Sequence, residues 1–412
     1  MRWADTETET APVAFADELQ AVADTASERH PDGWRPSATY SAHGGELVGR
    51  IPNGADADPA FWRLVISDWG LDPDTTEIVP DSVQIRAWDM PIGKGETMRA
   101  RYYKANIRPR RAAMCADDVA ELAKAAARRT KRPPATTHDG VGFVCCLSDW
   151  QIGKSEGGGT VATVERITRA LDQAVARLRE LRKAGRVISS VWLVGMGDLA
   201  EQCIGFYPAQ QWSVDCTRRE QLQIVRTLLL SAVDRFVDLT GSLVVGAVPG
   251  NHGENRANGK MITDVSDNDD LAVFDQVRDA LAKNPDRYGH ITWHISDELV
   301  LTANVAGVEV AWTHMHQGAG SGERKIAEWW RSQVMGNRPI SAAQILNTAH
   351  YHHLLVSEST GRTIIQVPAM DGGSAWFTER TGQSSPSGMV TYLAGTECGL
   401  RGWSDLAIME GQ

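Results

Sequence analysis

The chain lacks the features that mark several large classes of protein. No apolar run approaches the length that spans a membrane, and the acidic opening Met1–Glu7 does not have the composition of a signal peptide. The six cysteines show no metal-type pairing, which favours free thiols in a reducing cytosol. Repeats of solenoid length, coiled-coil segments and ATPase segments are also missing. We therefore expect a globular, cytoplasmic protein that does not associate with membranes.

The chain also lacks an excess of positive charge. Its 42 Lys and Arg residues face 52 Asp and Glu residues, so the formal net charge is -10. This balance argues against a protein that coats nucleic acid over its whole surface. A hydrophobic content of 42% and a charged content of 23% are ordinary for a globular protein, and 412 residues suffice for two domains. Charge alone leaves the substrate open.

Composition and periodicity divide the chain into three parts. Residues 1–40 mix acids, Ala, Pro and Ser with little periodicity and predict a flexible arm. Residues 41–135 predict a small accessory α/β domain, which ends in a helix over Ala112–Arg129 and a linker over Lys131–Thr137. In residues 136–412 strands first alternate with helices and then dominate. This order predicts an α/β fold with two packed sheets and helices outside.

Side chains that can bind metals follow the apolar runs of the main domain. Three consecutive predicted strands are each followed by an oxygen ligand, at Asp149, Asp198 and Asn251. The carboxyl ends of parallel strands share one edge of a sheet, so these groups should meet. The later part of the chain supplies imidazoles, at His314, His350 and His352. Taken singly, each residue also fits a cap or a turn. Together they indicate a site for divalent metals.

This ordered series resembles the calcineurin-like metallophosphoesterase superfamily over roughly residues 140–370. The motifs that carry the resemblance are Asp149-Trp150-Gln151, Gly197-Asp198-Leu199-Ala200-Glu201, Gly250-Asn251-His252-Gly253-Glu254, His314 and His350-Tyr351-His352. The resemblance implies a two-sheet α/β/β/α sandwich and a hydrolase with two divalent cations, Mn²⁺ ahead of Mg²⁺.

The resemblance also implies a role for each residue. The first metal would be held by Asp149, Gln151, Asp198 and His352. The second metal would be held by Asp198, Asn251, His314 and His350. His252 would assist the leaving group or stabilise developing negative charge, and Glu201 would orient His252. The paired cations would activate the attacking water.

Three positions depart from the family pattern. Gln151 stands where the family has His, so we expect a weaker first site that prefers Mn²⁺ or Mg²⁺ to Zn²⁺ or iron. Glu201 stands in for an Asp, and Ala349 replaces a Gly. The Asp-Arg-Gly continuation of protein phosphatases is absent, because Gln202 and Cys203 follow Glu201. This absence argues against phosphoprotein chemistry.

A closer resemblance is to bacteriophage-encoded nucleases of the SbcD and Mre type. It is carried by Asp149–Lys154, Gly205–Pro208 and Asp371–Trp376. It implies a Mn²⁺-dependent DNA exo- or endonuclease of double-strand-break repair, with any ATPase partner on a separate chain. Basic residues interleaved with Tyr102 and Tyr103 could bind DNA: Arg99, Arg101, Lys104, Arg108, Arg110 and Arg111. The same segment also fits a solvated face of a small sheet.

Two other functions stay open. The acidic balance favours a phosphatase or phosphodiesterase of small phosphorylated metabolites. A catalytically degenerate family member that binds DNA or a partner is the other alternative, with Gln151 marking the loss of the first metal. Metal titration separates this last case, because such a chain should bind at most one Mn²⁺. The oligomeric state does not follow from the sequence.

Overall fold

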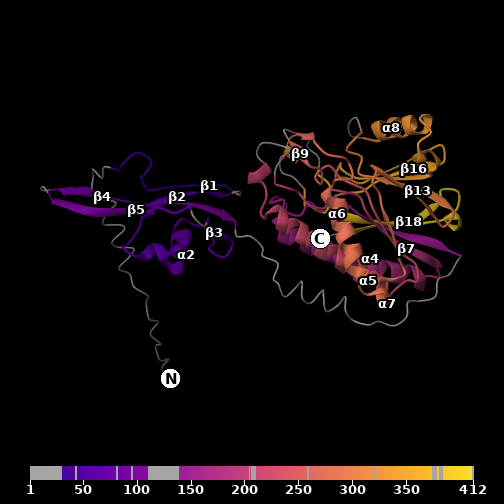
Figure 1. The fold of residues 1–412 in the computed structure, drawn as a ribbon, viewed down its shortest axis with the longest axis horizontal. Helices are drawn as coiled ribbons and strands as arrows, with labels where there is room; N and C mark the ends of the chain where they lie inside the picture. Colours follow the sequence, from indigo (N-terminus) through magenta and orange to yellow (C-terminus); the bar gives the residue numbers. More distant parts are fainter. Residues whose placement is uncertain are drawn as a thin grey trace, which may run out of the picture. The chain divides into compact units, whose positions relative to one another are not determined.

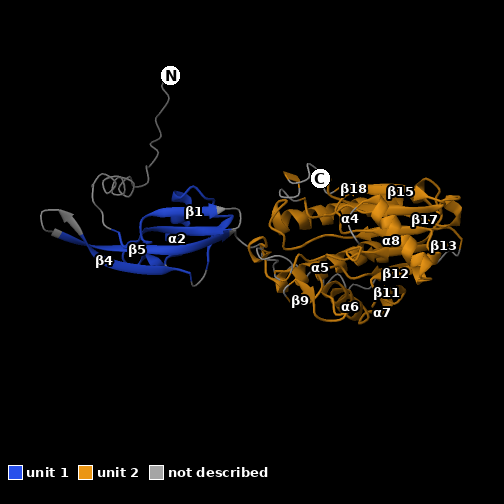
Figure 2. Ribbon diagram, turned by 90° about the horizontal axis from the view of Figure 1, so that it is seen from above, with its two compact units in different colours: residues 1–110 blue, residues 111–412 orange. Residues whose placement is uncertain are grey.

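The computed structural model describes residues 30–41, 44–79, 82–93, 96–109, 139–203, 205, 210–257, 259–318, 322–373, 378–379 and 384–410. The chain forms two compact units, unit 1 over Met1–Arg110 and unit 2 over Arg111–Gln412 (Figure 2). The predicted helix over Ala112–Arg129, the linker and the predicted boundary at residue 135 lie outside the described residues, as do residues 1–29. None of the described helices is long and apolar enough to cross a bilayer.

The described residues of unit 1 form an antiparallel five-stranded sheet, an α-helix and a short 3-10 helix. Strand β5 lies at the centre of the sheet and pairs with β2, β3 and β4, and β1 pairs with β2. The strands are β1 (Ser37–Ser41), β2 (Gly44–Arg50), β3 (Thr76–Ile78), β4 (Gln84–Gly93) and β5 (Glu96–Pro109). The arm predicted over residues 1–40 therefore extends too far, because β1 begins at Ser37.

One apolar run of unit 1, Phe61–Ile66, fits a helix or a strand from its sequence. It lies in helix α2 (Pro59–Asp68), after the short helix η1 (Ala55–Ala57). The side chain of Asp58 accepts a hydrogen bond from the backbone nitrogen of Ala60 at 2.9 Å and so caps the helix. Proline at the first helical position adds to the helix start. Local capping thus selects the helix.

Unit 2 contains two large sheets, each with a parallel centre. The six-stranded sheet has the order β11 (Ile291–Ile295), β8 (Leu243–Ala247), β7 (Ile188–Gly195), β6 (Val141–Leu147), β17 (Gly388–Ala394) and β18 (Trp403–Glu410). The five-stranded sheet has the order β12 (Val300–Val305), β13 (Val308–Thr313), β14 (Ile345–Thr348), β16 (Arg362–Gln366) and β15 (Leu355–Ser359). The parallel pairs are β11–β8, β8–β7, β7–β6, β13–β14 and β14–β16.

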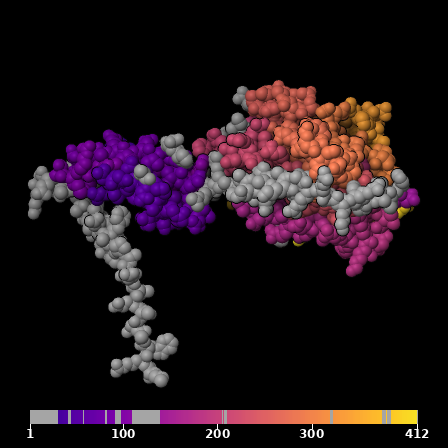
Figure 3. Space-filling model, turned by 60° about the horizontal axis from the view of Figure 1, so that its bottom comes forward, coloured from indigo at the N-terminus to yellow at the C-terminus, as the bar shows by residue number. Residues whose placement is uncertain are grey.

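The two sheets pack face to face between layers of helices. Alternate residues of β6 and β7, among them Val144 and Trp192, meet Val310 and Trp312 of β13 in the central core. The outer face of the six-stranded sheet is covered by α4 (Gly159–Lys183), α5 (Arg218–Val237), α6 (Asp269–Leu281) and α7 (Pro285–Tyr288). Figure 3 views unit 2 from the side of these helices.

Helix α8 (Glu323–Met335) and η3 (Pro339–Ala342) pack on the outer face of the five-stranded sheet. Figure 1 shows α8 on the opposite side of unit 2 from α4 and α5. The predicted α/β fold with two sheets and outer helices is therefore confirmed. The small remaining elements of unit 2 are η2 (Gln210–Trp212), η4 (Thr396–Cys398) and the hairpin of β9 (Arg256–Ala257) and β10 (Lys260–Met261).

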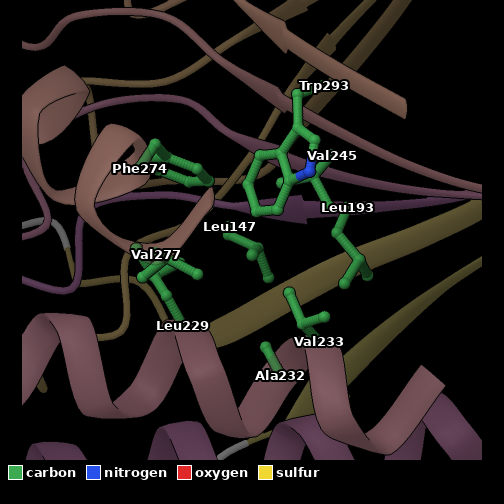
Figure 4. Close-up of a pocket in the computed structure, with 9 residues that line it drawn as sticks. All are labelled: Leu147, Leu193, Leu229, Ala232, Val233, Val245, Phe274, Val277 and Trp293. Atoms are coloured by element: carbon green, nitrogen blue, oxygen red, sulfur yellow. The ribbon is translucent and has the colours of Figure 1, made fainter. Parts of the chain in front are cut away.

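A small apolar pocket lies in the helix–sheet core of unit 2. Its lining comes from the strands of the six-stranded sheet and from α5 and α6 (Figure 4): Leu147, Leu193, Leu229, Ala232, Val233, Val245, Phe274, Val277 and Trp293. The lining contains no carboxylate, imidazole or thiol. The pocket therefore belongs to the packing of the core and not to a reaction site.

Candidate metal centre

The candidate ligands stand just after parallel strands of both sheets. In the six-stranded sheet, Asp149 follows β6, Asp198 follows β7 and Asn251 follows β8. In the five-stranded sheet, His314 follows β13, and His350 and His352 follow β14. Both sheets thus offer oxygen and nitrogen donors at the carboxyl ends of their parallel strands, where α/β proteins place their ligands.

Backbone hydrogen bonds hold the loops after β6 and β7 side by side. The backbone nitrogen of Asp149 donates to the carbonyl oxygen of Gly197 at 3.1 Å, and that of Gln151 donates to Asp198 at 3.0 Å. Gly197 has φ 84°, and a Cβ added there would lie 2.4 Å from the Cα of Gly250. Only glycine therefore lets the loop that carries Asp198 pass so close to the next one.

Five candidate ligands have a left-handed backbone, which is uncommon for residues other than glycine. They are Asp149 (φ 47°), Gln151 (φ 43°), Asp198 (φ 55°), His350 (φ 72°) and His352 (φ 58°). Such conformations cost free energy and cluster at functional sites, where the surrounding structure holds them. The residues with this backbone conformation are thus ones that the sequence analysis identifies as candidate metal ligands.

His314 lies in the first of two donor clusters. Its Nδ1 donates to the carbonyl oxygen of Met196 at 2.7 Å, because a carbonyl can only accept. In the neutral ring Nε2 then carries a lone pair, and it faces Asp198 Oδ2 at 2.9 Å and Asn251 Oδ1 at 3.1 Å. Ligand atoms of Asp198, His314 and His350 all lie within 4.8 Å of one another.

Asp149 is fully buried in the second cluster. Its Oδ1 lies 3.2 Å from His352 Nε2, and its Oδ2 accepts a hydrogen bond from the backbone nitrogen of His350 at 3.2 Å. The amide Nε2 of Gln151 lies 3.4 Å from His352 Nε2, while its Oε1 faces Lys154 Nζ at 3.4 Å. A ligand role for the Gln151 oxygen therefore requires the amide to turn about χ3.

Two buried oxygens test whether divalent cations fit this site. When the facing imidazoles are neutral, Asp149 Oδ1 and Asp198 Oδ2 accept no hydrogen bond from the described residues, although buried carboxylate oxygens normally have partners. Each oxygen instead faces an imidazole Nε2, at 3.2 Å and 2.9 Å. Atoms that bind one ion at about 2.1 Å and at right angles lie about 3 Å apart. The donors and their spacing therefore fit divalent cations.

The buried carboxylates and imidazoles shift one another's pKa values. Burial lowers the pKa of His314, but the Asp198 carboxylate outweighs burial and raises this pKa to about 9. Burial likewise lowers the pKa of His352, and Asp371 and Asp149 raise it to about 10. Burial and the charge of His314 lower the pKa of His350 to about 4. Burial raises the pKa of Asp198, but His314 and His252 outweigh it and hold this pKa well below its usual value.

His252 lies beside this centre. Its backbone nitrogen donates to Asp198 Oδ1 at 2.7 Å, and its Nδ1 lies 2.8 Å from the carbonyl oxygen of Glu201. The Glu201 carboxylate is farther from the ring, with Oε2 at 3.6 Å from Nδ1. The backbone of Glu201, more than its side chain, therefore orients the imidazole. With Nδ1 held in this way, Nε2 is the ring nitrogen suited to meet a substrate.

Asp270 is a residue of this site that the sequence analysis missed. Its carboxylate is buried and accepts hydrogen bonds from three backbone nitrogens: Asp198 (3.0 Å), Leu199 (3.0 Å) and Gly250 (3.1 Å). It thereby joins the loops after β7 and β8. Burial and the nearby Asp198 raise the pKa of Asp270 to about 6. In sequence, Asn268-Asp269-Asp270 signals only the start of a helix.

The described candidate residues for DNA binding in unit 1 do not form a free cationic surface. Each described candidate makes an ion pair: Arg99 with Asp89 (3.1 Å), Arg101 with Asp56 (3.6 Å), Lys104 with Glu46 (3.1 Å) and Arg108 with Glu77 (2.7 Å). Tyr102 and Tyr103, which lie among these basic residues, are buried, so their rings are not available to stack on bases. Arg110 and Arg111 lie outside the described residues, as do residues 206–208 and 374–376 of the nuclease-like motifs.

Comparison with known proteins gives only distant structural likeness. No protein-family model and no curated protein matches the chain. Vacuolar Protein Sorting 29 from Cryptosporidium parvum is 12% identical, with a TM-score of 0.28 over 66% of this chain and 97% of its own. An archaeal phosphodiesterase is 10% identical, with a TM-score of 0.29 over 65% of this chain and 99% of its own. A predicted phosphoesterase from Streptococcus pneumoniae TIGR4 is 9% identical, with a TM-score of 0.27 over 62% and 84%. Likeness this low carries no argument about function.

Proposed function

We propose that this chain is a metal-dependent phosphodiester hydrolase with a two-metal centre of the calcineurin-like type. The observation that carries the proposal is the meeting of buried Asp149 and Asp198 with the imidazoles of His314 and His352, at oxygens that accept no hydrogen bond from the described residues when these rings are neutral. Bound there, divalent cations would activate water and neutralise charge on the phosphoryl group.

The residues divide into two ligand sets that share Asp198. One set is Asp149, Gln151, Asp198 and His352, and the other is Asp198, Asn251, His314 and His350. The shared carboxylate already faces two ways, with Oδ1 toward the backbone of His252 and Oδ2 toward His314. Mn²⁺ suits this mixture of carboxylate, amide and imidazole donors, and Mg²⁺ is the second candidate.

His252 is assigned the work on the leaving group. Its Nδ1 is held by the carbonyl of Glu201, so its Nε2 can give a proton to the departing oxygen or donate a hydrogen bond to developing negative charge. Burial lowers the pKa of His252, but Asp198 and Glu201 outweigh it and raise this pKa above its usual value.

As substrate we propose DNA, with the chain acting as a Mn²⁺-dependent exo- or endonuclease of double-strand-break repair. The support is the nuclease-like segment Asp149–Lys154, which lies within the metal centre. Small phosphorylated metabolites are the second candidate, because Arg99, Arg101, Lys104 and Arg108 each make an ion pair and the formal net charge is -10.

One assay tests both levels of the proposal. The purified full chain is incubated with Mn²⁺ and labelled single- and double-stranded DNA, and in parallel with bis-p-nitrophenyl phosphate. Hydrolysis that stops on chelation and in Asp198→Asn supports a metal-dependent phosphodiesterase. Activity on bis-p-nitrophenyl phosphate without DNA cleavage refutes the nuclease, and inactivity toward every phosphoester with Mn²⁺ or Mg²⁺ refutes the hydrolase.

A further inference from the structure

A buried carboxylate lies behind the candidate ligand His352. Asp371 is 2% exposed and lies in the loop that follows strand β16 of the five-stranded sheet. The backbone beside it is fixed, because the nitrogen of Met370 donates to the carbonyl of Asp149 at 3.0 Å and the carbonyl of Met370 accepts from Arg166 Nε at 2.9 Å. Asp371 Oδ1 accepts a hydrogen bond from a backbone nitrogen of its own loop at 2.9 Å. The carboxylate therefore has a set direction.

The other oxygen of Asp371 contacts the imidazole. Asp371 Oδ2 lies 3.4 Å from His352 Nδ1, while Nε2 on the far side of the ring lies 3.2 Å from Asp149 Oδ1. A carboxylate at Nδ1 keeps the ring proton there, so Nε2 presents its lone pair toward Asp149. Carboxylates commonly support metal-binding histidines in this way, and they fix both the tautomer and the orientation of the ring.

An ammonium group shares this same oxygen. Lys154 Nζ makes an ion pair with Asp371 Oδ2, and it lies 3.4 Å from Gln151 Oε1 and 4.0 Å from Glu156. The Lys154 side chain is only 13% exposed. One positive charge is thus held beside Gln151, at the subsite where the superfamily has a histidine. It competes with His352 for Asp371 and repels a cation bound nearby.

We propose that Asp371 is the positioning residue of the first metal subsite and that Lys154, through the same carboxylate oxygen, weakens cation binding there. The inference rests on the proposed two-metal function. Asp371 holds the His352 ring with Nε2 toward Asp149, whereas Lys154 adds a positive charge to this subsite alone. The two metals should therefore bind with unequal affinity, and changes at Asp371 and Lys154 should move the affinity of the weaker one in opposite directions.

The test is Mn²⁺ titration of the full chain by isothermal titration calorimetry. We expect the wild type to bind two Mn²⁺ with unequal affinity. Asp371→Asn should weaken the weaker event by about 10- to 100-fold and leave the tighter one unchanged. Asp371→Glu keeps the charge and should restore most of the affinity. The matched control is Asp234→Asn, an ion-paired carboxylate that contacts Arg287 at 3.4 Å and no candidate ligand. It should change neither event.

Lys154→Gln serves as the second variant, which also decides the matter if Asp371→Asn does not fold. It leaves Asp371 to His352 alone and removes a positive charge, so the weaker Mn²⁺ should bind severalfold more tightly. If Lys154→Gln binds the weaker Mn²⁺ with lower or unchanged affinity, Lys154 does not weaken cation binding at this subsite. If Asp371→Asn binds both Mn²⁺ ions with the wild-type affinities, Asp371 does not position the first metal subsite. A wild type that binds fewer than two Mn²⁺ instead refutes the two-metal centre itself.

Discussion

The carboxylate of Asp270 offers the sharpest check on how the ligand loops are held. It accepts hydrogen bonds from the backbone nitrogens of Asp198, Leu199 and Gly250, at 3.0 to 3.1 Å. Asp270→Ala removes all three bonds at once and leaves the donors in a buried site. We expect the loops after β7 and β8 to open locally far more often, while the rest of unit 2 stays protected.

The size of this effect follows from the chemistry of the bonds. A hydrogen bond to a charged acceptor contributes about 1.5–3 kcal/mol. At about 1.4 kcal/mol per factor of ten, each released amide should exchange roughly 10- to 150-fold faster. Unit 2 as a whole should lose less stability than three such bonds suggest. Burial and Asp198 raise the pKa of Asp270 to about 6, so keeping this carboxyl ionised in the folded chain at pH 7 costs free energy, and its removal relieves that cost.

Hydrogen–deuterium exchange read by mass spectrometry measures this directly in peptides that cover Asp198, Leu199 and Gly250. The matched control is Asp269→Asn, one residue earlier in the same helical turn. The Asp269 carboxylate accepts hydrogen bonds from the side chains of Gln202 and Arg218, and not from the backbone nitrogens of Asp198, Leu199 and Gly250 that Asp270 holds. Unchanged exchange at the three amides in Asp270→Ala, or acceleration spread evenly over unit 2, would show that the carboxylate does not hold these loops.

Three further predictions concern the metal centre. His252→Ala should bind the same number of Mn²⁺ ions but lose about 10²- to 10⁴-fold in kcat, and an unchanged kcat contradicts its assigned role. Gln151→His should keep or raise activity and extend it to Zn²⁺, whereas loss of hydrolysis would mean that Gln151 is not at a ligand position. His314 and His352 have pKa values raised to about 9 and about 10, so both hold protons at pH 7.5 without metal. Mn²⁺ binding should therefore release about two protons and tighten toward pH 9, as calorimetry in buffers of different ionisation enthalpy would measure. The stability that these two groups give the metal-free chain is complete below about pH 6.5 and is lost as the pH rises through their raised pKa values.

The ligands Asp149, Asp198 and Asn251 could be predicted from the sequence because each follows an apolar run whose residues are mostly buried. Strand β14 could not be predicted in this way, because Ile345–Thr348 has only four residues and ends in Asn and Thr. It nevertheless leads directly to His350. Helix α8 also escaped, because a polar loop precedes it and only Ile326 and Trp330 are fully buried. Short or half-exposed elements leave a weak periodic signal.

Contacts between distant residues account for the remaining misses. Asp371 and Lys154 meet across 217 positions in the chain, so no local pattern joins them. The ion pair of Lys104 with Glu46 depends on the register between β5 and β2, which places Lys104 opposite Val48. From the sequence alone, a run of basic residues therefore suggests a cationic face, because its acidic partners become apparent only when the neighbouring strand and its register are known.

The shared edge of the two sheets has a consequence for biosynthesis. Carboxylate and amide donors emerge early, by Asn251, whereas the imidazoles at His314, His350 and His352 emerge only after most of unit 2 has left the ribosome. A nascent chain that ends before His314 offers hard oxygen ligands and no complete centre. The six-stranded sheet itself needs β17 and β18, which follow all three imidazoles in the chain, so the full ligand set is held in place only when both sheets have formed.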